Sequence, residues 1–256
     1  MFSWQHFVWL FICALLITAS LVLYEKKKPS FRTVLTYCCI ICFLSEFTKV
    51  FNVIEMVPSE DGSMIFPYLP MNHLPLHLCS LQILLIVYLR LSENEKTKEN
   101  LMVFMFPSCI LGALSALLMP SIFTTSITVD QAFTSPMAYQ FFIFHSMLIV
   151  LGVIIAKCGV IEWKWEHYFR CMAIAVVLGF ISLYVNSIFA SPTYLNGKLL
   201  HVDFWPNFMF SYNNPLGIRI TTLTGWYLYL VILLTVIAVL CFICFFIVIR
   251  KKPKKA

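Results

Sequence analysis

Long apolar stretches are the feature that most constrains the fold of this chain. A helix of about 20 apolar residues crosses the hydrocarbon core of a bilayer, and such stretches follow one another along almost the whole sequence. The sequence therefore predicts an all-α fold, a polytopic membrane helix bundle of about seven transmembrane helices that forms a single integral membrane domain over 1–256. We place the spans at 4–24, 33–54, 74–91, 101–120, 137–157, 168–189 and 220–249.

Composition leaves no room for a soluble domain. Hydrophobic residues make up 61% of the 256 positions and charged residues only 12%, which is far from the balance of a water-soluble protein. The net charge of +6 needs no nucleic acid to explain it, because basic residues lie beside the spans and in the tail at 250–255, so no nucleic acid is expected as a partner. The first span is followed directly by charged residues and has no small-residue cleavage site, so we expect a retained anchor rather than a signal peptide.

Two spans depart from the simple pattern. The second contains Glu46 and Lys49, and the third is short and opens with Pro75 and His77. Either segment is expected to be broken or re-entrant, because irregular backbone at membrane depth is tolerated only where protein or a cavity surrounds it.

Lysine and arginine predict the orientation, because they concentrate in cytoplasmic loops. Fifteen lie on one side of the seven spans, whereas only Lys198 and Arg219 lie on the other. The N-terminus is therefore expected outside or in the lumen and the C-terminus in the cytoplasm. Lys252 and Lys254 resemble a dilysine retrieval signal, which predicts the endoplasmic reticulum membrane for a eukaryotic source, whereas a bacterial source would place the protein in the plasma membrane.

The ten cysteines do not form a disulfide framework. Nine fall inside spans and Cys158 lies in a predicted cytoplasmic loop, so none is placed where an oxidising compartment favours disulfides. The pairs Cys39 with Cys42 and Cys241 with Cys244 lack the second pair of ligands that a zinc site needs. We therefore expect no metal and no cofactor.

Polar side chains gather in the outer halves of the spans, whereas the inner halves are almost uniformly apolar. This distribution argues against a polar path across the bilayer and favours a cavity open to the outer leaflet, whose apolar walls suit a lipid. Membrane phospholipids are therefore the expected partners. The outer polar residues are Glu46, Lys49, Asn52, His77, Cys79, Gln82, Gln140, His145 and Asn186.

Cys79 and His145 are the pair in this set that is capable of nucleophilic catalysis, since a buried thiol needs a neighbouring base to become a thiolate. The alternative is that the cysteine is an apolar filler and the histidine bridges helices. Glu46 and Lys49 have the i, i+3 spacing of an ion pair and are interpreted as a charge-neutral strut, with a phosphate head group on Lys49 as the alternative.

The segment 74–80, Leu-Pro-Leu-His-Leu-Cys-Ser, resembles the signature of the YwaF and transmembrane protein 164 family. Shorter motifs in the order of that family follow at 111–114, 144–146 and 224–227, and the resemblance covers roughly 40–235. The resemblance implies a cysteine-dependent acyltransferase of the endoplasmic reticulum, which moves polyunsaturated acyl chains from phosphatidylcholine to lyso ether phospholipids. It also implies that Cys79 is the nucleophile and His145 the base.

The mechanism that follows is a hypothesis. His145 takes the proton of Cys79, the thiolate attacks a donor ester to give an acyl-thioester, and a lyso acceptor resolves it. Ser80, Gln82 or Asn186 would donate hydrogen bonds to the oxyanion, and His77 either orients the site or satisfies the start of the third span. The alternatives are a non-catalytic lipid-binding protein, receptor or transporter, and a lipid hydrolase of the same fold.

Overall fold

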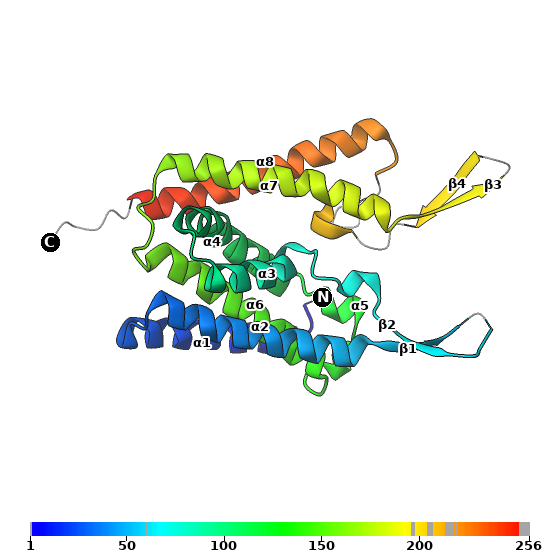
Figure 1. The fold of residues 1–256 in the computed structure, drawn as a ribbon, viewed down its shortest axis with the longest axis horizontal. Coiled ribbons are helices and arrows are strands. Elements are labelled where there is room, and N and C mark those ends of the chain that lie inside the picture. The colour runs from blue at the N-terminus through cyan, green and yellow to red at the C-terminus, as the bar shows by residue number, and fades with distance from the viewer. Residues whose placement is uncertain are drawn as a thin grey trace. The chain divides into compact units, whose positions relative to one another are not determined.

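Seven helices of 14 to 28 residues build the part of the chain that the structure describes (Figure 1). The computed structural model describes residues 2–59, 61–195, 198–203, 207–212, 218 and 220–250, so Lys252, Lys254 and Arg219 lie outside the described residues. The prediction of an all-α membrane bundle is confirmed. The helices are α1 (Trp4–Lys27), α2 (Phe31–Val53), α3 (Leu78–Leu91), α4 (Glu95–Leu118), α6 (Pro136–Lys157), α7 (Trp165–Ile188) and α8 (Leu223–Arg250), with a single turn, α5, at Ile122–Thr125.

Six of these helices are long and apolar enough to cross a membrane, and α3 is the exception. Its 14 residues extend about 21 Å at 1.5 Å per residue, against about 30 Å of hydrocarbon. The third span was predicted to begin at residue 74, but the helix begins at Leu78. Pro75 keeps Leu74 in extended backbone, with ψ at 146°, because proline disfavours helical backbone in the residue before it. The non-helical backbone at 74–77 fits the expectation of a broken third segment, whereas α2 runs without a break from Phe31 to Val53, so the same expectation was wrong for the second span.

Capping side chains set where several helices begin. Ser30 accepts a hydrogen bond from the Thr33 N–H at the start of α2, and Asn94 accepts one from the Thr97 N–H at the start of α4. Each side-chain oxygen satisfies a backbone donor that has no acceptor inside its own helix. The connections between helices are therefore sharply defined by their own sequence.

Two β-hairpins occupy connections between the predicted spans. β1 (Glu55–Pro58) pairs with β2 (Ile65–Tyr68), and β3 (Ser191–Leu195) pairs with β4 (Lys198–Asp203). In the first hairpin the turn is built around Asp61, whose carboxylate accepts hydrogen bonds from the hydroxyls of Ser59 and Ser63. These bonds lower the pKa of Asp61 to about 2, because they favour the charged form. Short 3₁₀ turns, η1 (Met71–His73), η2 (Val129–Gln131) and η3 (Phe208–Phe210), complete the connections.

The chain divides into two compact units, which are described separately. The first unit contains residues 1–75 and 79–162, and the second contains 76–78 and 163–256. In the first unit, α6 is the central helix and packs against α4, α2 and α1 (Figure 1). Gly152 of α6 lets α4 approach closely, since a Cβ at this position would lie 3.0 Å from the Phe106 carbonyl oxygen and 3.3 Å from Cys109 Cβ. Small residues at helix crossings are typical of membrane bundles.

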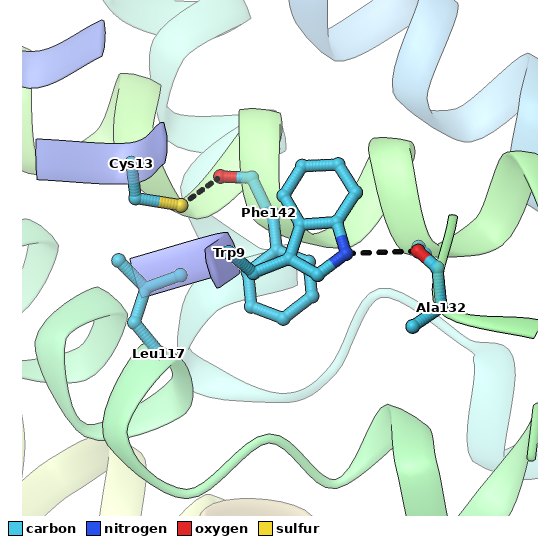
Figure 2. Close-up of a cluster of buried hydrophobic side chains, with 6 residues drawn as sticks. Trp9, Cys13, Leu117, Ala132 and Phe142 are labelled. Atoms are coloured by element: carbon cyan, nitrogen blue, oxygen red, sulfur yellow. Dashed lines mark hydrogen bonds between the residues drawn. The ribbon is translucent and has the colours of Figure 1, made fainter. Parts of the chain in front are cut away.

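The first helix is packed into this unit through its N-terminal half (Figure 2). The Trp9 ring stacks on Phe142 at 4.6 Å between centroids, and its Nε1–H donates to the Ala132 carbonyl oxygen at 2.8 Å. Cys13 lies against the Phe142 carbonyl oxygen, and His6 Nε2 donates to the Leu117 carbonyl oxygen at 2.8 Å. These contacts pack the N-terminal half of α1 into the core of the first unit.

Large apolar side chains remain on the outside of the helices. Phe11 of α1 is 65% exposed and Phe43 of α2 is 68% exposed, and similar residues cover the free faces of α7 and α8. Exposed apolar surface of this extent is characteristic of contact with another apolar phase. Together with the six long apolar helices, it is the surface of a multi-pass membrane protein.

The second unit is built on α7 and α8. Trp165 stacks on Phe242 at 5.1 Å between centroids, and the Tyr168 hydroxyl donates to the Ala238 carbonyl oxygen at 3.4 Å. These contacts join the first turns of α7 to the second half of α8. At its other end α7 packs against η3.

Candidate active site

Cys79 is the second residue of α3 and is half-buried. The first turn of a helix carries backbone N–H groups without acceptors inside the helix, so Cys79 lies beside donors that the helix itself does not use. Ser80 follows in the same turn. The thiol of Cys109 on α4 is near enough to Cys79 for charges on the two sulfur atoms to interact.

Gln82 fixes this first turn of α3 to α4. The side chain is fully buried, and its Nε2–H donates to Ser108 Oγ at 3.0 Å while its Oε1 accepts a hydrogen bond from the Cys109 thiol at 3.3 Å. Ser108 in turn donates to the Phe104 carbonyl oxygen at 2.7 Å. The amide that was expected as an oxyanion donor is therefore engaged in holding two helices together, one turn from Cys79.

His145 lies in the middle of α6 in an aromatic environment. Its Nδ1 is 2.7 Å from the Phe141 carbonyl oxygen, and its ring packs against the rings of Phe141 and Phe144. A carbonyl oxygen can only accept, so Nδ1 carries the hydrogen and the neutral imidazole has its lone pair on Nε2. Among the described residues, the hydrogen bond found for this ring is the one at Nδ1, and none is found at Nε2. The histidine is thus held in the tautomer that a general base requires.

Helices α3, α4 and α6 all meet near Cys109. This level is a common reference from which the depths of Cys79 and His145 along their helices can be compared. Cys79 precedes Gln82 by three residues, which is about 4.5 Å along α3, and His145 precedes Gly152 by seven residues, about 10.5 Å along α6. Both displacements lead away from this level toward the same end of the unit. The two residues therefore differ by about 6 Å in depth, although no hydrogen bond joins them among the described residues.

Glu46 and Lys49 form the ion pair that their spacing predicted. The Nζ of Lys49 lies 2.7 Å from Glu46, with side-chain exposures of 10% for the lysine and 29% for the glutamate. Beside this pair, Gln140 of α6 donates to Ser45 Oγ of α2 at 2.7 Å. The neutralised pair and the hydrogen bond support the interpretation of this region as a strut between helices.

His77 and Asn186 belong to the second unit. Asn186 donates from Nδ2 to the Phe208 carbonyl oxygen at 3.1 Å and to Ser211 Oγ at 2.8 Å, and its Oδ1 accepts from the Phe208 N–H at 2.9 Å. The His77 ring meets the Phe208 ring edge-on at 4.9 Å. Because both amide hydrogens of Asn186 are donated to the Phe208–Ser211 turn, this side chain anchors a loop rather than offering a free donor to an oxyanion.

Sequence reasoning missed Ser108 and Cys109, the two residues that form hydrogen bonds with the Gln82 amide. The sequence shows them as two adjacent, more polar residues in the otherwise apolar 101–120 span. Nothing in the sequence indicates that they contact Gln82. Among the described residues, no group of three or more histidine, cysteine, aspartate or glutamate side chains is close enough to hold a metal ion.

Comparison with known protein families shows which family the chain belongs to. Residues 1–248 match the model of the TMEM164 family. The chain belongs to the TMEM164 family. The match confirms the resemblance drawn from the 74–80 motif, and it extends beyond 40–235 to include α1 and nearly all of α8. Searches of the curated proteins and of the solved structures gave no match.

Proposed function

We propose that this TMEM164 family member is a membrane-embedded, cysteine-dependent phospholipid acyltransferase in which Cys79 is the nucleophile and His145 the general base. The hydrogen bond from His145 Nδ1 to the Phe141 carbonyl oxygen carries this proposal. It fixes the ring in the tautomer that presents Nε2 as a proton acceptor. A histidine that merely bridged helices would be expected to use its second nitrogen in a contact as well.

The first half-reaction forms a thioester. His145 Nε2 takes the Cys79 proton, and the thiolate attacks the ester carbonyl of phosphatidylcholine to form a C–S bond. The carbon–oxygen ester bond then breaks, and the proton passes from His145 to the departing alkoxide, which leaves as lysophosphatidylcholine. The oxyanion of the intermediate would be stabilised by donors in the first turn of α3, including the Ser80 hydroxyl.

The second half-reaction transfers the acyl group to a lyso ether phospholipid. His145 Nε2 accepts the proton of the acceptor hydroxyl, whose oxygen attacks the thioester carbonyl. The C–S bond breaks, and Cys79 recovers its proton from His145. The apolar side chains of the surrounding helices exclude bulk water, which favours transfer to a lipid hydroxyl over hydrolysis. Polyunsaturated acyl chains and the endoplasmic reticulum membrane belong to this proposal through the family resemblance.

The test is acyl transfer by purified protein in nanodiscs. Phosphatidylcholine with an isotopically labelled polyunsaturated chain is the donor, a lyso ether phospholipid is the acceptor, and labelled product is measured by mass spectrometry. Cys79→Ala and His145→Ala are expected to abolish transfer, whereas Cys39→Ala, a matched change of another half-buried cysteine in a span, should retain it. Transfer that survives in folded Cys79→Ala and His145→Ala protein would overturn the proposal. Label released only as free fatty acid would identify a hydrolase instead.

A further inference from the structure

The first unit has one end at which basic residues collect. Lys157 at the end of α6 pairs with Glu25 of α1 at 2.7 Å, and Arg90 at the end of α3 contacts Thr36 near the start of α2. These contacts bring the ends of four helices to the same level. Arg90 follows Cys79 by eleven residues, or about 16 Å along α3, so this end is separate from the candidate active site.

A cavity of about 300 Å³ opens at this basic end between α2, α3 and α4. Its size is at the lower limit of sites that hold small molecules. Part of its wall is apolar and deeply buried, with Leu35, Leu89 and Met102 at 2–3% exposure. Its lining is Phe31, Arg32, Leu35, Leu89, Arg90, Leu91, Ser92, Glu93, Glu95, Lys98, Met102 and Val160.

The basic side chains of the lining outnumber its acidic ones, and two of the basic side chains are arginines. Lys98 is neutralised by Glu95 at 2.7 Å. Arg32 and Arg90 have no carboxylate within ion-pair distance in the described part of the chain. Glu93 is the remaining acidic side chain of the lining. The cavity therefore carries a net positive charge that the protein itself does not neutralise.

Arg90 is also held in position. Its Nε–H donates to Thr36 Oγ1 at 2.9 Å, and the Thr36 hydroxyl donates to the Arg32 carbonyl oxygen at 3.0 Å. This chain of hydrogen bonds fixes the guanidinium through Nε and leaves its two terminal amino groups available. A guanidinium arranged in this way suits the bidentate recognition of phosphate oxygens.

We propose that this cavity binds the head group of an anionic phospholipid, with the phosphate on Arg90 and Arg32 and the glycerol and first acyl carbons against Leu35 and Leu89. Phosphate is the ligand because the lining contains two guanidinium groups, from α2 and α3, that form no ion pair among the described residues, against one carboxylate, Glu93, outside the Lys98–Glu95 pair. A lipid is preferred to a soluble phosphate because the deeper wall is apolar, and basic pockets between helices at a membrane surface are typical lipid head-group sites.

The experiment compares three probes on the purified full chain in detergent. Phosphatidic acid carries both the phosphate and the acyl chains, glycerol 3-phosphate carries the phosphate alone, and phosphatidylcholine is a lipid without net charge. Binding is measured by native mass spectrometry and by the ligand-induced rise of the unfolding temperature. Phosphatidic acid is expected to bind at least ten times more tightly than either of the other probes.

Two variants and a matched control assign the site. Arg90→Gln and Arg32→Gln should each weaken phosphatidic acid binding at least tenfold, whereas Lys157→Gln, which removes a cation at the same end outside the cavity, should leave it within twofold. Arg32 is exposed, so its variant is expected to fold even if Arg90→Gln does not. Equal losses in all three variants would mean non-specific surface attraction, and equal binding of glycerol 3-phosphate would mean a soluble ligand. Either result overturns the proposal.

Discussion

Gly152 offers a sharp test of how α6 is packed against α4. An added Cβ would lie 2.6 Å from Ile110 Cγ1 and 3.0 Å from the Phe106 carbonyl oxygen. The first atom belongs to a side chain and can shift, but the second is backbone, so the two helices must separate. Overpacking of this kind costs about 1–3 kcal/mol. At about 2–4 °C per kcal/mol for a protein of this size, Gly152→Ala should lower the unfolding temperature by roughly 2–12 °C.

Gly179→Ala is the matched control for this prediction. Gly179 is also a helical glycine in a membrane span, but a Cβ at this position would meet nothing within 4 Å. The control should therefore be neutral or slightly stabilising, since alanine is the better helix former by about 1 kcal/mol. Both variants are compared with the parent by thermal unfolding in the same detergent. Equal unfolding temperatures for the two variants would refute the close α4–α6 contact.

Three further substitutions test individual contacts through the unfolding temperature. Lys49→Met should cost about 1–3 kcal/mol of stability, because it leaves Glu46 partly buried without its partner. Adding Glu46→Gln should recover most of that loss. A double variant less stable than the single one would contradict the ion pair. Asn186→Ala should cost about 2–4 kcal/mol of stability, because the backbone groups of Phe208 lose their hydrogen-bond partner. Folded variant protein should keep the proposed acyl transfer. Loss of transfer without loss of stability would instead indicate that Asn186 is an oxyanion donor. Trp9→Phe should cost about 1–2 kcal/mol through the lost hydrogen bond to Ala132, and an unchanged unfolding temperature would contradict that bond.

The membrane-spanning helices could be predicted from the sequence because the bilayer imposes a length and an apolar composition on each helix. The irregular start of α3 was also foreseeable, since Pro75 lies in an apolar segment too short to cross the membrane. The hairpin β1–β2 was not foreseen. Its strands are four residues each, and a turn built by Asp61 with two serines has no apolar alternation to mark it.

The candidate site was predictable in its residue types but not in its contacts. Cysteine, histidine and glutamine at membrane depth are rare enough to stand out from the apolar background. By contrast, the partner of His145 is a backbone carbonyl, and every residue has one, so no sequence pattern could reveal the tautomer. Gln82 and Asn186 were expected to be free donors, yet their hydrogen bonds with Ser108, Cys109 and Phe208 depend on packing that only three dimensions provide.

The most direct test of the central proposal is the covalent state of Cys79 during turnover. Purified protein is incubated with polyunsaturated phosphatidylcholine without an acceptor, digested, and mapped by mass spectrometry before and after hydroxylamine, which cleaves thioesters. The proposal predicts a hydroxylamine-sensitive acyl adduct on Cys79 that is absent from His145→Ala protein and disappears from the parent when a lyso ether phospholipid is added. An unmodified Cys79 in folded protein that still transfers acyl chains would contradict it.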